Sequence, residues 1–500
     1  MDDIQLSYVV AFLAIVGMLL LTTKPNKSKT YAEIPIVGAD KFSSAELKAR
    51  YVTEANTLLK EGYQKFGDIF QLFTSDGPRI FVSRKYANEL KNYHRHEVNN
   101  MKAIFDRLMG KYTKLGYDNE NLTDAIQINL NQNLAKFIPD VYDEIMRSFA
   151  TVFPPCEDWT VVNIEAVLLR IVSQASARAF VGPILSRNID WLELTEQYVA
   201  DAFVGGRKLK AWRPLLRPIA QYFVPEIRRI PITLKRAHTL LLPLLTEKTE
   251  AAKMEGYQKP NDLIEWVRDR VVVKGGKPMS YREETLIQVL ATTGSIHTTR
   301  MTIFHILLDL AARPEYIEPL REEVREVLRK SGPQWTKASL SQLQLMDSFM
   351  KESQRLNPPS LATFERKLLI PITLSNGMKL PAGQVVHCNT AVLEDAPANW
   401  GDPNIFDGFR FHRLRSNPSD SNKYQFASSN LEFMEWGLGR EACPGRFYAS
   451  CEIKIILAHI LLKYEIAFEN PEAGRPENFM IEVDVIADPR TKLQFKERKD

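Results

Sequence analysis

The chain has 500 residues, 45% apolar and 25% charged, with a net charge of +4 from 65 basic and 61 acidic residues. This balance excludes a disordered or collagen-like chain and gives no indication of a nucleic-acid partner. The cysteines form no CxxC pair, so neither a zinc ribbon nor a disulfide framework is predicted; they are Cys156, Cys388, Cys443 and Cys451. A chain of this length has room for a large core with an internal cofactor cavity.

An apolar run, LSYVVAFLAIVGMLLL, occupies Leu6 to Leu21, and two threonines extend it to about the length that spans a bilayer. Two aspartates precede the run and three lysines soon follow it, which by the positive-inside rule places the rest of the chain in the cytosol. A cleaved signal peptide would instead begin with basic residues. We therefore predict a transmembrane anchor at residues 1–23, a linker at 24–45 and one large domain at 46–500.

The elements expected after the linker are mostly helices. Residues 69–83 (IFQLFTSDGPRIFVS) predict a hairpin that turns at Asp76-Gly77. Helical periodicity then dominates from about residue 85 to 355. A second hairpin is predicted from Ile372 to Val386 with its turn at Asn376-Gly377, and a strand-rich piece from Met480 to Phe495. The predicted fold class is mainly α with small β-sheets.

The segment Trp212 to Ile230, WRPLLRPIAQYFVPEIRRI, mixes apolar residues, arginines and prolines. Such a composition is typical of a segment that lies on a membrane surface. A loop between two packed helices is the alternative, and the sequence leaves both open.

The most informative segment is WGLGREACPGRFYA, Trp436 to Ala449, which contains Cys443. A run with helical spacing follows from Arg446 to Tyr464, and a cysteine at a helix N-terminus is favoured as a thiolate. Three glycines would let the backbone approach a flat ligand: Gly437, Gly439 and Gly445. A thiolate on a tight loop suits an axial ligand of haem iron. A buried structural cysteine is the alternative.

Glu352 and Arg355 lie three residues apart on a helix predicted from Leu345 to Asn357, which places them on one face. Such a pair is usually a solvated contact worth little. Arg410, in the segment PNIFDGFRF, is positioned in the sequence to join them. The helix pair, the aromatic segment and the Gly-rich cysteine loop, in this order near the C-terminus, resemble the cytochrome P450 family. The resemblance covers nearly the whole chain and implies the cytochrome P450 fold.

The resemblance implies a role for each of these residues. Cys443 would be the axial thiolate, and hence the metal ligand, of heme b (iron protoporphyrin IX). A structural triad would hold the cysteine loop in place, formed by Glu352, Arg355 and Arg410.

The helix that faces the haem is expected from Tyr281 to about Ala311, opened by a capping box of Ser280 and Glu283. In the family it opens in its middle, here TTGSIHTT, to admit oxygen. Thr298 matches the threonine that helps to deliver protons. His297 stands where the family usually has an acid; a histidine relays protons near neutral pH, and a packed core histidine is the alternative.

Arg366 matches the family arginine that binds a haem propionate, and an exposed strand residue is the alternative. Glu441, two residues before the cysteine, stands where the family usually has a cation and would repel a propionate. Arg440 is the adjacent candidate to replace that cation. Gln127 aligns with an arginine that fungal relatives often carry. These departures predict weaker haem retention or a shifted potential.

The resemblance implies a fungal microsomal enzyme of secondary-metabolite biosynthesis at the endoplasmic reticulum membrane. It would use O2 to hydroxylate or otherwise oxidise a hydrophobic small molecule, a terpenoid or polycyclic intermediate. The substrate pocket would be lined by Met101 to Thr113, residues 291–298, Ser360 to Thr363 and Val483 to Ile486.

Electrons would come from an NADPH-cytochrome P450 reductase, because this chain has no flavin or nicotinamide motif. The reductase would dock on Arg440, Arg446 and Lys454. Two alternatives stay open. One is a haem-thiolate enzyme with non-oxygenating chemistry, such as an isomerase, dehydratase or coupling catalyst. The other is a membrane-tethered haem-binding protein without catalysis.

Overall fold

The computed structural model describes residues 31, 33–388 and 397–499. The predicted anchor at residues 1–23 therefore lies outside the described residues, as does most of the predicted linker. Within the described ranges, no helix is both long enough and apolar enough to cross a membrane.

The described chain is mainly helical, as predicted. Its long helices are α2 (Ser44–Phe66), α7 (Asn131–Val152), α8 (Ile164–Leu185), α9 (Ile189–Lys210), α11 (Pro225–Ala251), α13 (Tyr281–Ala312) and α18 (Arg446–Lys463). Its shorter helices are α3 (Arg84–Leu90), α4 (Asn100–Arg107), α5 (Gly110–Thr113), α6 (Glu120–Asp124), α10 (Arg217–Ala220), α12 (Leu263–Val273), α14 (Ile317–Ser331), α15 (Lys337–Gln342), α16 (Gln344–Leu356) and α17 (Arg410–Arg415). A π-helical turn at Ala125–Leu130 leads into α7.

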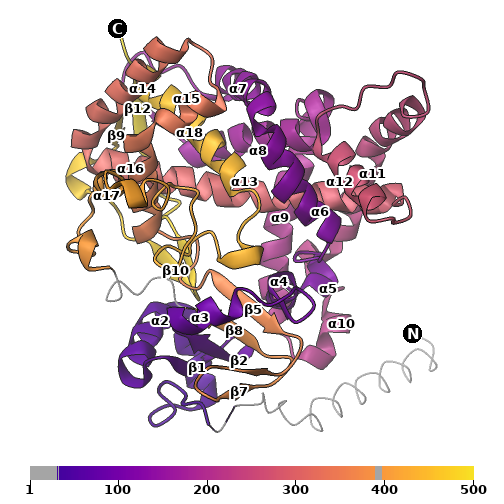
Figure 1. Cartoon of the computed structure of the whole chain (residues 1–500), viewed down its shortest axis with the longest axis vertical. Helices are drawn as coiled ribbons and strands as arrows, with labels where there is room; N and C mark the ends of the chain where they lie inside the picture. The colour runs from indigo at the N-terminus through magenta and orange to yellow at the C-terminus, as the bar shows by residue number, and fades with distance from the viewer. Residues whose placement is uncertain (1–30, 32, 389–396, 500) are drawn as a thin grey trace, which may run out of the picture.

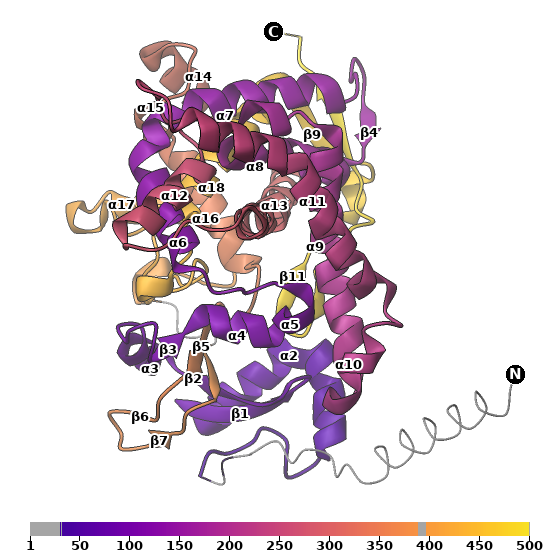
Figure 2. The same cartoon turned by 90° about the vertical axis from the view of Figure 1, so that its right-hand side faces the viewer.

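The helix α13 is the central element of the fold. It crosses the middle of the molecule in Figure 1, and Figure 2 shows it end-on with α8, α9, α11 and α18 around it. The predicted capping box is present, because Ser280 Oγ accepts from Glu283 N at 3.3 Å and the Glu283 carboxylate accepts from Ser280 N at 2.8 Å. The helix therefore begins where the sequence predicted. More than half of its residues are buried, and they are spread along its whole length.

The strands form small sheets beside the helices. The largest has the order β1-β2-β8-β5-β3 and lies with α2 and α3 at the bottom of Figure 1. Its strands are β1 (Ile69–Thr74), β2 (Gly77–Val82), β3 (Val98–Asn99), β5 (Phe364–Leu368) and β8 (Val385–Cys388). The other sheets pair β4 (Thr160–Val162), β12 (Leu493–Glu497) and β9 (Tyr464–Phe468); β6 (Ile372–Thr373) and β7 (Lys379–Leu380); and β10 (Phe479–Ile481) and β11 (Asp484–Ile486).

Both predicted hairpins differ in detail from the structure. In the first, Thr74 pairs with Gly77, so the turn is Ser75-Asp76, one residue earlier than predicted. Gly77 has a φ of 106°, which a residue with a side chain rarely adopts. The second hairpin contains only the two-residue strands β6 and β7. The strand β8 does not join this hairpin. It pairs with β2 and β5 in the main sheet, where all four of its residues are buried.

The segment Trp212 to Ile230 connects α9 to α11, as predicted by the interpretation that it is a loop between two packed helices. It includes a 3₁₀ turn at Pro214–Leu216, then α10, and then the first residues of α11. Several of its large apolar side chains are exposed: Trp212, Leu215, Ile219, Tyr222 and Phe223.

A fully buried carboxyl group lies on α18, next to the Ser176 hydroxyl. Glu452 of α18 is fully buried, and neither of its carboxyl oxygens has a hydrogen-bond partner among the described residues. Burial raises the pKa of Glu452 well above its usual range, and the nearby Ser176 hydroxyl only partly offsets this rise. The folded protein therefore holds this carboxyl group in its protonated form.

We expect Glu452→Gln to stabilise the protein increasingly as the pH rises. Above a pH of about 4.3 the unfolded chain ionises Glu452 and the folded chain does not, so the wild type loses up to about 1.4 kcal/mol per pH unit relative to the variant. Urea unfolding of both proteins at pH 5, 6 and 7 measures this difference. Glu250→Gln, at an exposed ion pair, is the control and should show a constant difference. A constant difference for Glu452→Gln as well would mean that the buried carboxyl group ionises normally.

Candidate active site

Hydrogen bonds fix the loop around Cys443 at Trp436, before the cysteine, and at Arg446, after it. The backbone N–H of Cys443 donates to the carbonyl oxygen of Trp436 at 2.7 Å. The guanidinium of Arg446, the first residue of α18, donates to the carbonyl oxygens of Cys443 at 2.7 Å and Ala427 at 3.1 Å. The Ser429 hydroxyl donates to the Gly437 carbonyl oxygen. These bonds fix the cysteine at the entrance to α18, as the helical spacing predicted.

The protein by itself does not favour a Cys443 thiolate. Burial raises the pKa of the Cys443 thiol, while the backbone N–H groups of Gly445 and Arg446 and the charge of Arg446 only partly offset this rise. The predicted effect of the helix end is therefore present but smaller than the cost of burial. Coordination to a metal cation deprotonates a thiol outright, so a bound iron would supply the missing stabilisation.

The loop glycines serve the loop itself. Gly437 and Gly439 have φ values of 75° and 71°, in the left-handed region. A Cβ on Gly439 would lie 2.6 Å from the carbonyl oxygen of Lys91, just after α3. Gly445 has an ordinary φ of −88°. A side chain at Gly437 or Gly439 would therefore strain the turn, and at Gly439 it would also clash with Lys91. The sequence did not reveal either reason for these glycines.

The middle of α13 presents small groups to open space. Gly294 and Thr298 are exposed although α13 is the central helix, and a Cβ on Gly294 would meet no atom within 4 Å. The Thr298 hydroxyl donates to the Gly294 carbonyl oxygen at 3.0 Å. The backbone is helical throughout Tyr281–Ala312, so the expected opening of the helix is not seen in this structure. The hydroxyl groups of Thr292, Thr293 and Thr298 donate to carbonyl oxygens of the preceding turn, so they are satisfied within a regular helix.

His297 lies in a buried environment. Burial, with Arg300 nearby, lowers the pKa of His297 to about 4. Its Nε2 has no hydrogen-bond partner in the part of the chain that the structure describes. The imidazole is therefore neutral at pH 7, and the role of His297 as a proton relay stays a prediction.

The predicted group of Glu352, Arg355 and Arg410 is assembled in the structure. Glu352 Oε1 lies 2.7 Å from Arg355 Nη2, and Glu352 Oε2 lies 3.3 Å from Arg410 Nε. The backbone N–H of Asp407 also donates to Glu352, at 3.0 Å. All three charged side chains are at least 95% buried, so this is not the solvated pair that the spacing alone would indicate.

Arg366 is buried in β5, which excludes the exposed-strand alternative. It is 2% exposed and donates to the carbonyl oxygens of Glu365 at 2.9 Å and Leu438 at 2.8 Å. Burial lowers the pKa of Arg366 to about 10, so the guanidinium stays charged at pH 7. Its Nε lies 3.5 Å from Glu441 Oε2.

Arg440, the candidate replacement cation, and Gln127, the position where relatives carry an arginine, both lie on the surface of the described chain. Arg440 is exposed, and its guanidinium lies 2.9 Å from His94 Nδ1. Gln127 is exposed on the π-helical turn. One turn later, Asn131 donates to the carbonyl oxygen of Pro444 at 3.4 Å, a contact to the cysteine loop that no sequence pattern indicated.

The residues present fit an iron porphyrin. The half-buried Cys443 lies just before the start of α18, a helix that contacts α13. The face of α13 at Gly294 and Thr298 has open space beside it. The buried guanidinium of Arg366 offers the positive charge that a carboxylate of such a group requires.

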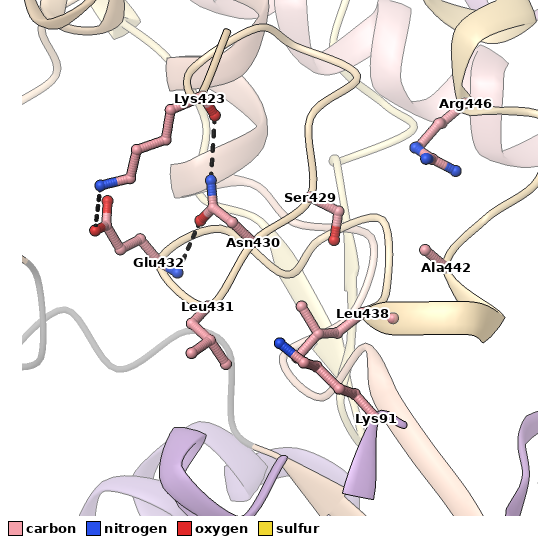
Figure 3. Close-up of a pocket in the computed structure, with 10 residues that line it drawn as sticks. Lys91, Lys423, Ser429, Asn430, Leu431, Glu432, Leu438, Ala442 and Arg446 are labelled. Carbon is pink, nitrogen blue, oxygen red and sulfur yellow. Dashed lines mark hydrogen bonds and ion pairs between the residues drawn. The ribbon is translucent and has the colours of Figure 1, made fainter. Parts of the chain in front are cut away.

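A hollow of about 490 Å³ lies beside the cysteine loop (Figure 3). Its lining includes Lys91, Lys423, Leu438, Ala442 and Arg446. Lys423 lies 2.6 Å from Glu432, and the close-up draws this ion pair as a dashed line.

The prediction that Lys454 lies on this face was wrong. It is buried and lies 2.6 Å from Asp347, because the following turns of α18 point into the core.

Three of the four predicted pocket segments meet. Arg107, Ser360, Ala362 and Val483 line one small cavity of about 20 Å³, and Leu361 N donates to the carbonyl oxygen of Val483 at 2.8 Å. Charged side chains share this lining, including Glu365, which lies 3.0 Å from Arg107. This cavity therefore has a partly charged lining, although the predicted substrate is hydrophobic.

Comparison with known proteins agrees with this geometry. The family profile described as Cytochrome P450 matches residues 47–495. Cytochrome P450 monooxygenase braC of Annulohypoxylon truncatum is 51% identical over 466 residues, 93% of this chain and 92% of that protein. An ent-kaurene oxidase of Gibberella intermedia is 34% identical over 484 residues, 94% of this chain and 89% of its own length.

The solved structure of cyanobacterial CYP120A1 with bound retinoic acid superposes with a TM-score of 0.67. It covers 90% of this chain and 96% of its own at 16% identity, which shows the shared fold.

The fold and the matching relatives define a haem-dependent oxidoreductase. The chain belongs to the cytochrome P450 family. It is a monooxygenase, and enzymes of this family use haem iron, O2, a hydrophobic substrate and a redox partner.

Proposed function

We propose that this monooxygenase hydroxylates or otherwise oxidises a hydrophobic intermediate of secondary metabolism, of terpenoid or polycyclic type. The observation that carries the proposal is the hydrogen-bonded Cys443 loop at the start of α18, a helix that packs against α13. The fungal relatives support the substrate class, since one of them is named ent-kaurene oxidase.

We propose heme b as the cofactor, with Cys443 as its axial ligand and Arg366 facing a propionate. When bound, the haem iron would activate O2 so that one oxygen atom enters the substrate and the other becomes water. Glu352, Arg355 and Arg410 hold the segment that leads to the cysteine loop and take no part in the chemistry. Thr298 holds a proton at its hydroxyl on the open face of α13.

The test of this proposal is the carbon monoxide difference spectrum of the reduced, purified protein. We expect a strongly red-shifted Soret band, and then O2 uptake tied to NADPH use when apolar substrates are screened with a reductase. A normal band without O2 uptake would favour non-oxygenating chemistry. The absence of a band would reject the haem-thiolate assignment.

Thr298→Ala should lower the ratio of product formed to NADPH consumed by about tenfold or more, because a positioned proton donor contributes about 10²–10⁴-fold to a rate. Product and NADPH are measured together with any apolar substrate that shifts the haem spectrum. Thr302→Ala is the matched control, since the Thr302 hydroxyl donates to the Thr298 carbonyl oxygen one turn further along. An unchanged ratio in Thr298→Ala would exclude Thr298 from proton delivery.

We propose that an NADPH-dependent reductase docks over the hollow beside the cysteine loop. Lys91 and Arg446 line this hollow (Figure 3). The exposed Arg440 directly follows Gly439, another lining residue. Cations at this place attract an acidic partner surface. The hollow also lies against Ala442, the residue before Cys443, which places a docked partner next to the proposed ligand.

We propose a location at the endoplasmic reticulum membrane, with residues 1–23 as anchor and the domain from residue 46 in the cytosol. The exposed apolar side chains between α9 and α11 support a second contact with the membrane. Tyr222 and Phe223 are 68% and 72% exposed, and Arg213 and Arg217 lie in the same segment. Apolar side chains interleaved with arginines suit the interface of an anionic bilayer.

A dye attached at Phe223→Cys should be quenched by brominated lipids when the full chain is inserted in vesicles. Met254→Cys is the matched control, because Met254 is equally exposed at 72% and lies beyond the far end of α11. The 27 residues of α11 separate the two positions by about 40 Å. Equal quenching at both positions would contradict the membrane contact.

A further inference from the structure

Glu441 lies at the centre of a cluster that joins three segments of the chain. Its Oε1 lies 3.2 Å from Arg95 Nε, and its Oε2 lies 3.5 Å from Arg366 Nε. Its Oε2 also accepts the backbone N–H of Asn100 at 2.6 Å. The carboxylate is only 11% exposed, so water screens these contacts little.

Through Asn100 this cluster holds the N-terminus of α4, the helix that borders the proposed substrate side. Asn100 is the first residue of α4, and its free backbone N–H is one of the donors that a helix leaves without an internal partner. A carboxylate at this position also interacts favourably with the helix dipole. The Asn100 side chain donates to the Glu365 carbonyl oxygen at 2.9 Å, which ties the same residue to β5.

The other end of α4 is fixed to the same strand. Arg107, its last residue, lies 3.0 Å from the Glu365 carboxylate. Arg366 bonds the Leu438 carbonyl oxygen at 2.8 Å, so β5 contacts the cysteine loop directly as well. The residue Glu441 is therefore the loop's direct link to α4, and β5 is a second, indirect link.

We propose that Glu441 is a positioning residue that couples the Cys443 loop to α4. Its negative charge balances Arg366 and shares Arg95 with Asp118, which lies 2.8 Å from the Arg95 guanidinium, and its carboxylate fixes the first turn of α4. The orientation of α4 on the substrate side thus depends on a residue two positions from the cysteine. The significance of this coupling for catalysis rests on the proposed function, whereas the coupling itself rests on the contacts alone.

Amide hydrogen exchange of the purified holoenzyme tests the coupling. In Glu441→Ala we expect the amides of residues 100–107 to exchange about tenfold faster or more, because a hydrogen bond to a charged group is lost. Glu441→Gln keeps an acceptor for Asn100 and should restore most of the protection. Glu250→Ala, at the exposed pair with Lys253, should leave these amides unchanged. Exchange in Glu441→Ala within twofold of the wild type would overturn the proposal.

Two further variants decide the role of the charge. Arg95→Gln removes one partner and leaves Glu441 in place, so it keeps the test valid if Glu441→Ala does not fold; we expect faster exchange in residues 95–107. Glu441→Arg places a third cation beside Arg95 and Arg366 and removes the acceptor of the Asn100 N–H, so we expect faster exchange in residues 100–107. Normal exchange in either Arg95→Gln or Glu441→Arg would overturn the proposal.

These outcomes are separable from a failure of the proposed function. If Cys443 is not the haem ligand, the wild type lacks the red-shifted carbon monoxide band, while the exchange difference at α4 persists. If the coupling is absent, the band is present in the wild type and the exchange difference is not.

Discussion

Replacing Glu352 with alanine is expected to lower the free energy of unfolding by about 3–5 kcal/mol, because it leaves two buried guanidinium groups without their carboxylate. Arg355 donates to Glu352 through two atoms, at 2.7 and 2.8 Å, and Arg410 lies 3.3 Å away. All three residues are at least 95% buried, so water cannot replace the lost hydrogen bonds. Urea unfolding of the wild type and the variant measures the difference.

Glu250→Ala is the control for this prediction. It removes a carboxylate from an exposed pair with Lys253, and such pairs contribute about 0–1 kcal/mol. If Glu352→Ala lost no more stability than this control, the buried group would not hold its segment in place.

The effect of Glu352→Ala should also reach the cysteine loop. Arg410 begins α17, and the next residue, Phe411, packs edge-on against Phe433 with ring centroids 6.0 Å apart. Lys351, the neighbour of Glu352, lies 3.2 Å from the centroid of the Phe433 ring. Phe433 lies three residues before Trp436, whose carbonyl oxygen accepts the Cys443 N–H. Haem content per chain should therefore fall in Glu352→Ala and stay unchanged in Glu250→Ala.

The sequence predicted those parts of the site that depend on local spacing. The i, i+3 spacing placed Glu352 and Arg355 on one helix face, and the S-x-x-E pattern located the start of α13. The Gly-rich loop before a helical run located Cys443 at the entrance to α18. In each case the interacting groups lie within a few residues of each other, so the backbone geometry alone brings them together.

The sequence did not predict contacts that depend on packing between distant segments. Glu441 and Asn100 are 341 residues apart, and no spacing rule connects them. We expected Glu441 to repel a propionate, and the structure shows that two arginines already surround it. Lys454 was predicted on the docking face with Arg440 and Arg446, whereas it is buried and pairs with Asp347 in the core. The raised pKa of Cys443 likewise follows from burial, which spacing does not reveal.

Replacing Cys443 with serine should abolish the strongly red-shifted carbon monoxide band of the reduced protein. The variant changes one atom in a loop whose backbone is fixed by the Cys443 N–H bond to Trp436 and by Arg446 on the Cys443 carbonyl oxygen. Neither bond involves the sulfur atom, so the fold of the loop should persist. A hydroxyl group lacks the electron-donating sulfur that a thiolate ligand provides to haem iron. The spectrum, together with haem content per chain, measures the loss.

Cys451→Ser is the matched control, because Cys451 lies on the same helix, eight residues further along, and is also partly buried. Burial raises the pKa of Cys451 to about 11, and no group nearby offers it the helix-end N–H donors that Cys443 has. The control should keep the band, its position and its haem content. A band that survives Cys443→Ser and disappears in Cys451→Ser would move the proposed ligand to α18 itself. A band lost in both would mean that serine in either place disturbs the packing of α18, and Cys443→Ala would then be compared with Cys451→Ala to decide which sulfur atom binds the iron.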